Sequence, residues 1–202
     1  YYLMNKELAP AALADCKIEN FEFTGREMTG AEWELAEFMH PWASYNRTVY
    51  VLEGNHVTLD AGTGCVHTAP GHGVDDFEVY KKYENEGKLK QEVICPVDNK
   101  GRMTAEAGSF LEGKTVWEAV GPSISALAHE GMLLGKKSLH HQYAHCWRCK
   151  NPVIYRATEQ WFASINDFRE DALKAVDETR FIPSWGHDRL YNMIRDRQDW
   201  CI

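Results

Sequence analysis

The sequence predicts a fold that mixes helices with short strands and is divided into two parts. Three observations support this prediction. First, helical and strand-like segments alternate up to about residue 160. Second, charge-rich helical segments follow. Third, the acidic chain becomes basic in the stretch just before these last segments. With 202 residues, 44% of them hydrophobic, the chain is long enough for one large core or two small ones. We therefore expect a domain at 1–160 and a second part at 161–202.

The first elements are a short helix and a pair of strands. Residues 1–40 are acidic and contain a predicted helix at 10–14, with Pro10 near its first turn. Residues 49–52 and 57–59 alternate in the manner of strands, and a Gly-Asn pair lies between them. This pattern predicts a β-hairpin.

Further helices and a strand follow along the chain. Residues 75–83 read as a helix, with acids at its start and lysines later, as the helix dipole favours. Residues 93–97 resemble a short buried strand that ends in a turn at 98–101. A helix is predicted at 122–130, where Ile, Leu and Ala line one face before a glycine.

The last part of the chain changes in charge. Residues 131–158 contain no acid but several basic residues, whereas the chain as a whole carries a net charge of −8. Beyond this segment, residues 167–180 and 188–197 are expected to form surface helices of mixed charge. A final strand is expected at 199–202.

The composition excludes several classes of protein. The proportion of charged residues, 26%, is typical of globular proteins and not of collagen-like or disordered chains. No stretch approaches the roughly 20 apolar residues that a membrane-spanning helix needs, so we expect no membrane contact. Six cysteines are too few for a disulfide scaffold, and no secretory signal is present. We therefore expect reduced thiols and a cytoplasmic location.

Both ends of the sequence indicate a fragment. The chain opens at Tyr1 without an initiator Met or a basic leader, and it closes on a strand-like run. We expect a piece excised from a longer chain.

The densest polar cluster of the sequence is residues 62–77, GTGCVHTAPGHGVDDF. A strand predicted at 65–67 runs through a loop of Gly and Pro into the start of a helix. Backbone N–H groups are bare at such a junction, and glycines let the backbone approach a ligand closely. The segment is neither a Walker A loop nor a dinucleotide fingerprint, because it lacks both Gly-Lys-Ser/Thr and G-x-G-x-x-G.

Three interpretations of this segment stay open on spacing alone. In the first, Asp75 caps the helix and the histidines are surface residues. In the second, His67, His72 and Asp76 bind a metal ion. In the third, the segment forms a pocket for a ligand with an ammonium group, which pairs with a carboxylate while backbone N–H groups and His hold its carbonyl end.

Residues 62–77 also resemble the signature of a known family. It is the editing domain of the isoleucyl-tRNA synthetases, an insertion in the class I catalytic fold called connective peptide 1. Residues 56–60 resemble the stretch leading into this signature, and residues 145–162 resemble the return toward the catalytic domain. Residues 183–186 and 199–202 resemble the start of the rejoined synthetase core.

The resemblance implies an α+β fold. A small β-barrel with flanking helices would form the editing domain, and residues 161–202 would be a stem returning toward the parent's Rossmann-type catalytic domain. The two ATP-binding motifs of the family are absent, as is the Thr-rich peptide that lines its editing pocket. ATP and Mg therefore belong to the full-length enzyme only, and we expect no aminoacyl-adenylate formation by this fragment.

The implied activity is hydrolytic editing, without a required cofactor, of valine mischarged on isoleucine tRNA. A pocket that accepts isoleucine cannot strongly reject valine, because one methylene is worth only about 1–3 kcal/mol, and this pair of amino acids is the usual example of that limit. The implied partners are isoleucine tRNA and the rest of the synthetase chain, in a monomer. The alternatives are a non-catalytic tRNA-docking insert and an editing domain of the valyl or leucyl type.

The resemblance also implies roles for single residues. Asp76 would pair with the α-ammonium of the mischarged amino acid, and His67 would lie beside the aminoacyl group, so these two are the predicted catalytic residues. The other residues predicted to bind substrate lie in the same segment: Gly64, Thr68, Gly71, His72, Gly73 and Asp75.

A second motif lies in the acid-free segment. Cys146 and Cys149 form the only CxxC pair of the sequence and could supply half of a tetrahedral zinc site. The resemblance implies a second such pair upstream, outside this chain. The basic residues of 136–156 could contact the acceptor end of tRNA, with Tyr143 or Trp147 stacking on an unpaired base. The alternative is a solvated basic face.

Overall fold

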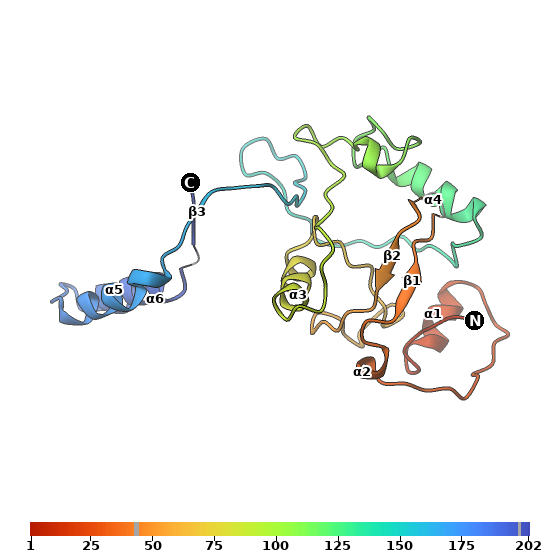
Figure 1. Ribbon diagram of the computed structural model, residues 1–202, viewed down its shortest axis with the longest axis horizontal. Helices are drawn as coiled ribbons and strands as arrows, with labels where there is room; N and C mark the ends of the chain where they lie inside the picture. The colour runs from red at the N-terminus through yellow and green to blue at the C-terminus, as the bar shows by residue number, and fades with distance from the viewer. Residues whose placement is uncertain (43–44, 198) are drawn as a thin grey trace. The chain divides into compact units, whose positions relative to one another are not determined.

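The structure is a computed structural model that describes residues 1–42, 45–197 and 199–202 (Figure 1). The chain divides into two compact units, Tyr1–Ala157 and Thr158–Ile202. This division falls close to the domain boundary expected at residue 160. Each unit contains both helices and strands.

The elements of the first unit are, in chain order, α1 (Ala9–Asp15), α2 (Gly30–Trp33), β1 (Glu37–Met39), β2 (Thr48–Tyr50), α3 (Val74–Asn85), the 3-10 helix η2 (Ala105–Ala107) and α4 (Val120–His129). Those of the second unit are β3 (Phe162–Ala163), α5 (Asn166–Glu178), α6 (Trp185–Arg195) and β4 (Trp200–Cys201). All five predicted helices are confirmed, by α1, α3, α4, α5 and α6.

Local signals account for the ends of these helices. Pro10 lies in the first turn of α1, where its missing N–H has no intrahelical partner to lose. Asp75 and Asp76 lie in the first turn of α3, and Lys82 lies in its last turn. The residue after the α4 C-cap, Gly131, has a φ of 70°, a left-handed conformation that favours glycine.

The β-barrel expected from the resemblance is not formed by the described residues. Their strands make two separate two-stranded sheets, β1–β2 and β3–β4, and neither sheet closes on itself. Both pairs are antiparallel, with Glu37 opposite Tyr50 in the first and Phe162 opposite Cys201 in the second. The fold is therefore a mixed α and β fold with small open sheets.

The predicted hairpin between 49–52 and 57–59 is also wrong. β2 pairs instead with β1, which precedes it in the sequence. Beyond the ladder, the N–H of Val51 donates to the carbonyl of Ala36 at 3.0 Å. The N–H of Glu53 is the next backbone donor that a hairpin would use. It donates instead to the Tyr83 hydroxyl at 2.9 Å. A side chain of α3 thus takes the place of the predicted strand.

Two further predicted strands form no ladder. Residues 65–67 belong to no strand in the described structure, and 93–97 contribute only an isolated bridge between Val97 and Met103. The turn predicted at 98–101 is confirmed, because the N–H of Gly101 donates to the carbonyl of Asp98 at 3.1 Å.

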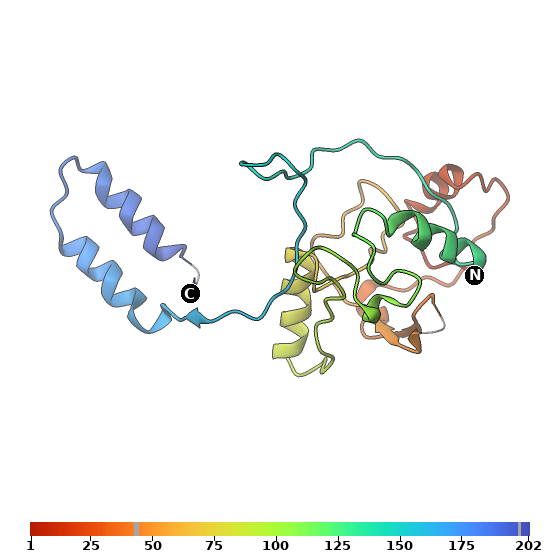
Figure 2. The same ribbon diagram turned by 90° about the horizontal axis from the view of Figure 1, so that it is seen from above.

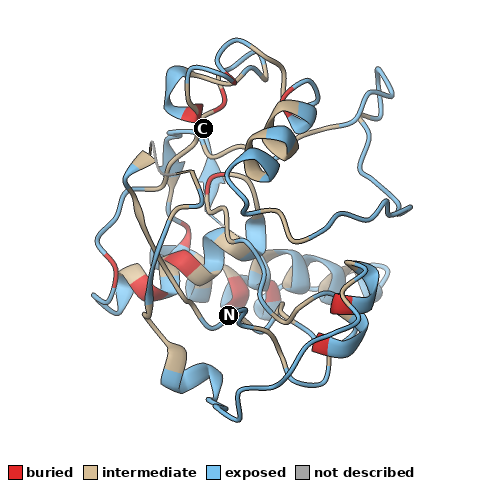
Figure 3. Cartoon of the chain, turned by 90° about the vertical axis from the view of Figure 1, so that its right-hand side faces the viewer, coloured by how far each residue is buried: buried red, intermediate tan, exposed pale blue. Residues whose placement is uncertain are grey.

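The buried residues of the first unit are few (red in Figure 3), and two small clusters of them form its core. Tyr80, Tyr83 and Leu89 form one cluster, with β2 packed against it through Tyr50. Ala107, Leu111 and Ala119 form the other. Tyr80 and Tyr83 belong to α3, so this cluster anchors the helix. The first turn of the same helix binds the preceding loop, because Asp76 accepts a hydrogen bond from Ala69.

The second unit is a pair of helices with a short sheet at its base. α5 and α6 lie side by side in both views (Figures 1 and 2). The imidazole of His187 lies 2.9 Å from Asp188 Oδ1 and 3.0 Å from Asp177 Oδ1, and these two contacts raise the pKa of His187. No helix in the described residues combines the length and apolar character needed to cross a bilayer.

Candidate functional site

The carboxylate of Asp76 holds the signature loop against the start of α3. Its Oδ2 accepts a hydrogen bond from the backbone N–H of Ala69 at 3.1 Å. The N-cap of α3 is Gly73, which has no side chain, so the interpretation of Asp75 as the cap is wrong. Asp76, in the first turn of the helix, binds the N–H of Ala69 in the preceding loop.

A histidine from outside the signature faces the same carboxylate. His56 Nε2 lies 3.8 Å from Asp76 Oδ1, and the two side chains are 22% and 19% exposed. His56 Nε2 is itself buried and has no hydrogen-bond partner in the described structure. One oxygen of Asp76 is therefore held by the backbone, and the other lies beside an imidazole.

Two glycines make room for this pair. A Cβ on Gly73 would lie 2.5 Å from Asp76 Oδ2, and a Cβ on Gly54 would lie 2.5 Å from His56 Cε1. Since real Cβ atoms do not approach other heavy atoms so closely, larger residues at either position would displace the side chains. The glycines thus leave the space that Asp76 and His56 occupy.

Gly71 and His72 join the signature loop to a distant part of the chain. The carbonyl of Gly71 accepts from the N–H of Ala157 at 2.7 Å, and a Cβ on Gly71 would lie 2.3 Å from the carbonyl oxygen of Ile94. His72 Nδ1 lies 3.0 Å from the carbonyl oxygen of Tyr155. A carbonyl can only accept, so Nδ1 carries the proton. Both residues are therefore used in packing.

The remaining predicted residues have other surroundings. Gly64 has a φ of 76°, and its Cβ would lie 2.5 Å from Asn5 Cβ, so this turn packs against the N-terminal segment. His67 is exposed and lies near His40, whose pKa is lowered mainly by burial and further by the charges of Arg47 and His67. Thr68 is half-buried, and Asp75 is exposed on α3.

The structure therefore gathers only part of the predicted set. It brings Asp76 and Gly73 together and adds His56, for which no role was predicted. The signal for His56 was present, because it begins the 56–60 stretch that leads into the signature. A metal site of His67, His72 and Asp76 is not formed, since no cluster of three or more metal-binding side chains occurs in residues 1–42, 45–197 and 199–202.

The CxxC motif lies on a tight turn that we call the knuckle, residues 143–153. Within it the N–H of Cys146 donates to the carbonyl of Asn151 at 2.8 Å, and the N–H of Lys150 donates back to the carbonyl of Cys146 at 2.9 Å. Hydrogen bonds from the backbone N–H groups of Cys149 and Arg148 lower the pKa of the Cys146 thiol. A lowered pKa favours the thiolate, which is the form of cysteine that binds a metal.

Aromatic and basic side chains project from the knuckle. Trp147 is 78% exposed, and the guanidinium of Arg148 lies 5.2 Å from the centre of its ring. The ring of Tyr143 has the rings of Trp117, His141 and His145 as neighbours. This exposed surface combines positive charge with flat apolar faces.

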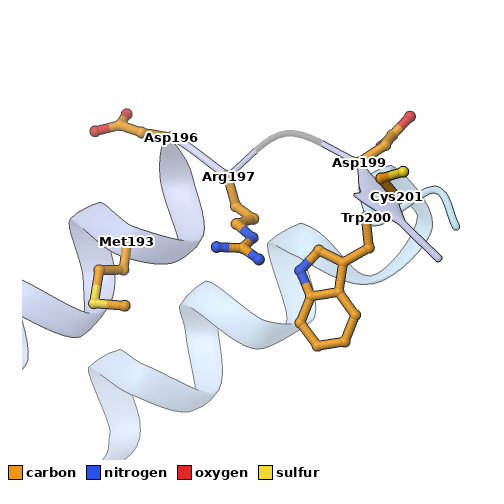
Figure 4. A pocket seen from close by; sticks show the side chains of 6 residues that line it. All are labelled: Met193, Asp196, Arg197, Asp199, Trp200 and Cys201. Atoms are coloured by element: carbon orange, nitrogen blue, oxygen red, sulfur yellow. The ribbon is translucent and has the colours of Figure 1, made fainter. Parts of the chain in front are cut away.

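A pocket of about 690 Å³ lies in the second unit, at the end of α6 (Figure 4). The guanidinium of Arg197 lies 5.4 Å from the ring centre of Trp200, and Asp199 Oδ1 accepts from the N–H of Ile165 at 3.2 Å. None of the residues predicted to act on a substrate lines it. Its lining residues are Met193, Asp196, Arg197, Asp199, Trp200 and Cys201.

Comparison with known proteins places the chain in a family. The family described as tRNA synthetases class I (I, L, M and V) matches residues 4–202. The chain belongs to the class I tRNA synthetases. This membership agrees with the resemblance noted for residues 62–77.

Similar class I synthetases are isoleucine–tRNA ligases. That of Caldicellulosiruptor bescii is 52% identical over 196 residues, which cover 97% of this chain and 20% of the relative. That of Syntrophomonas wolfei is 50% identical over 201 residues, and that of Bacillus cereus is 48% identical over 201 residues; each covers 100% of this chain and 21% of the relative. The chain thus spans about a fifth of the length of these curated relatives.

Proposed function

We propose that this chain is a segment of an isoleucine–tRNA ligase and that it removes valine wrongly esterified to isoleucine tRNA. The observation that carries this proposal is the state of Asp76. Its Oδ2 is bound by a backbone N–H, whereas Oδ1 has no hydrogen bond from the residues that the structure describes, and the side chain is 19% exposed. A carboxylate held in this way can pair with the ammonium group of an aminoacyl ester.

The position of Asp76 on α3 supplies further chemistry. The first N–H groups of a helix have no intrahelical partners, and the positive end of the helix dipole lies there. Such groups can stabilise the negative oxygen that develops when water attacks the ester carbonyl. The start of α3, at Val74–Asp76, therefore offers ammonium binding and oxyanion stabilisation within one turn.

The hydrolysis in this proposal needs no cofactor. Water attacks the ester carbon, the bond to the ribose oxygen breaks, and valine leaves with its carboxylate while the tRNA regains its hydroxyl. Asp76 orients the ester through its ammonium group, and His67 lies beside the aminoacyl group. ATP and Mg serve only the synthetic reaction of the full-length ligase.

The proposal extends to the partners of the chain. The substrate is isoleucine tRNA carrying valine, and the rest of the synthetase chain completes the enzyme, which we propose to be a cytoplasmic monomer. Residues 161–202 would form the stem that returns toward a Rossmann-type catalytic domain. The isoleucine type, as opposed to the valyl or leucyl type, is supported by the names of the relatives.

We propose zinc as a structural ligand of the knuckle. The N–H groups that lower the pKa of the Cys146 thiol favour the thiolate that zinc binds, so the motif fits this metal. Cys146 and Cys149 provide two of the four ligands of a tetrahedral site, and the other two would come from outside this chain. Zinc would brace the turn and take no part in ester hydrolysis.

A non-catalytic tRNA-docking role is the second candidate function. The exposed Trp147 with Arg148 against its ring, in a segment without acids, favours it. The two functions differ in what they require of Asp76, because docking through the knuckle does not need this carboxylate.

The test is deacylation of valyl-tRNA by the full-length ligase and by its Asp76→Ala variant. Glu78→Gln, which alters an exposed carboxylate on the same helix, is the matched control. We expect Asp76→Ala to lower kcat/KM about 100-fold, as for loss of a charge-assisted contact worth ~2.7 kcal/mol, and the control to change it less than about twofold. An Asp76→Ala variant with the activity of the control would leave docking as the better account.

A further inference from the structure

We propose that His56 is the positioning residue for Asp76, which it orients by donating its Nε2–H to Asp76 Oδ1. This inference rests on the proposed function, because it concerns the carboxylate that binds the ammonium group. Asp76 Oδ1 is the acidic oxygen that lies within ion-pair distance of this nitrogen, at 3.8 Å. This distance exceeds that of a hydrogen bond, so the proposed contact requires the two atoms to approach by roughly 1 Å.

Burial supplies the reason for this contact. His56 Nε2 is shielded from water and has no partner in the described structure. A buried donor without a partner costs free energy, and a charged acceptor is the strongest partner that it can find. A carboxylate only accepts, so the hydrogen bond requires the proton of the imidazole on Nε2.

The backbone around His56 restricts the ring. A Cβ on Gly54 would lie 2.5 Å from His56 Cε1 and 2.6 Å from Nδ1, so the ring lies directly against this glycine. The same Cβ would lie 3.1 Å from Val79 Cγ2 of α3. Gly54 therefore lets the loop that carries His56 approach the helix that carries Asp76.

The consequence is a carboxylate anchored at both oxygens. The N–H of Ala69 holds Oδ2, and the proposed bond from His56 would hold Oδ1, so rotation of the carboxylate would be restricted from two sides. The lone pairs that remain are oriented before the substrate arrives. A binding group that is already ordered binds more tightly because less conformational entropy is lost on binding.

The experiment compares two substitutions of His56 in the full-length ligase. His56→Leu removes the donor, whereas His56→Gln keeps an N–H donor at similar reach. KM and kcat are measured for deacylation of valyl-tRNA, beside the melting temperature of each variant. We expect His56→Leu to raise KM about 10-fold with kcat changed less than twofold, and His56→Gln to restore KM to within about threefold of the wild type.

Two outcomes overturn the inference. One is an unchanged KM in His56→Leu, and the other is a His56→Gln variant whose KM is as high as that of His56→Leu at an equal melting temperature. Asp76→Ala, measured in parallel, separates this inference from the proposed function. If Asp76→Ala loses deacylation while His56→Leu does not, only the role of His56 fails, whereas an Asp76→Ala variant of full activity removes the proposed function itself.

Discussion

The signature segment, residues 62–77, and the knuckle are held in place in different ways. Distant parts of the chain hold the signature, since the N–H of Ala157 and the carbonyl of Tyr155 bind it from one side and Asn5 lies against it from another. The knuckle is closed by hydrogen bonds between residues a few positions apart, from Cys146 to Asn151.

This difference bears on function. The proposed chemistry of Asp76 depends on tertiary contacts, so a change far from the carboxylate can displace it. The knuckle presents Trp147 and its cysteines through local structure, so its surface should tolerate changes elsewhere. Substitutions in the signature segment should therefore change stability and ester hydrolysis. Substitutions in the knuckle should change the binding of tRNA.

The largest effect on stability is expected from Gly71→Ala. The new Cβ would lie 2.3 Å from the carbonyl oxygen of Ile94, which belongs to the backbone and cannot easily move aside. We expect a loss of about 2 kcal/mol in the free energy of unfolding, measured with urea. Gly121→Ala in α4, with no atom within 4 Å of its Cβ, is the control and should stabilise the chain by up to ~1 kcal/mol.

A Gly71→Ala variant as stable as the wild type would contradict the packing of the signature against Ile94. It would also remove the main support for the view that tertiary contacts hold this segment.

A smaller effect on binding is expected from Trp147→Ala. Stacking of a base on an aromatic ring is worth about 1–3 kcal/mol, so we expect the Kd of the full-length ligase for tRNA to rise about 5- to 10-fold. Trp161→Ala is the control. Trp161 is 85% exposed and Trp147 is 78% exposed, but Trp161 lies outside the knuckle. Equal Kd values for the two variants, measured by filter binding at one fixed salt concentration, would exclude the knuckle as a tRNA contact.

The smallest effect on hydrolysis is expected from removal of zinc. Elemental analysis of the full-length ligase should show zinc that is lost when Cys146 and Cys149 are both changed to Ser. Deacylation of valyl-tRNA by this variant should stay within about twofold of the wild type, because no step of the proposed reaction uses the metal. An unchanged zinc content would disprove the proposed ligands.

The sequence predicted the helices well because their signals are local. Pro10, the acids at the start of α3 and Gly131 each mark a helix end through the conformation of their own neighbours. The tight turn of the CxxC motif is local in the same way.

The strands were predicted poorly because their partners are set by tertiary structure. The Glu53 N–H, which a hairpin would have used, is taken by the hydroxyl of Tyr83, thirty residues further along the chain. The strand-like alternation of residues 57–59 carries no information about the Tyr83 hydroxyl. The barrel, which came from the resemblance, failed at the same point, since the ladders of the described residues join strands only in two separate pairs.

The candidate site was predicted in part for the same reason. Asp76 stood out because it lies in a dense motif at a helix start, and Gly73 lies beside it. His56 is a single histidine twenty residues before Asp76, and only the folded chain brings the two within 3.8 Å. Gly71 and His72 belong to the motif, and the structure adds their contacts with Ile94 and Tyr155, which lie far along the chain.

The most direct test of the central claim, that Asp76 recognises the ammonium group, changes the substrate and the enzyme together. The rate of deacylation is measured for valyl-tRNA and for its analogue in which a hydroxyl replaces the α-ammonium. We predict that the wild-type ligase deacylates valyl-tRNA about 100-fold faster than the hydroxyl analogue. In Asp76→Asn, this ratio should fall to about threefold or less. A preference that survives Asp76→Asn unchanged would contradict the account.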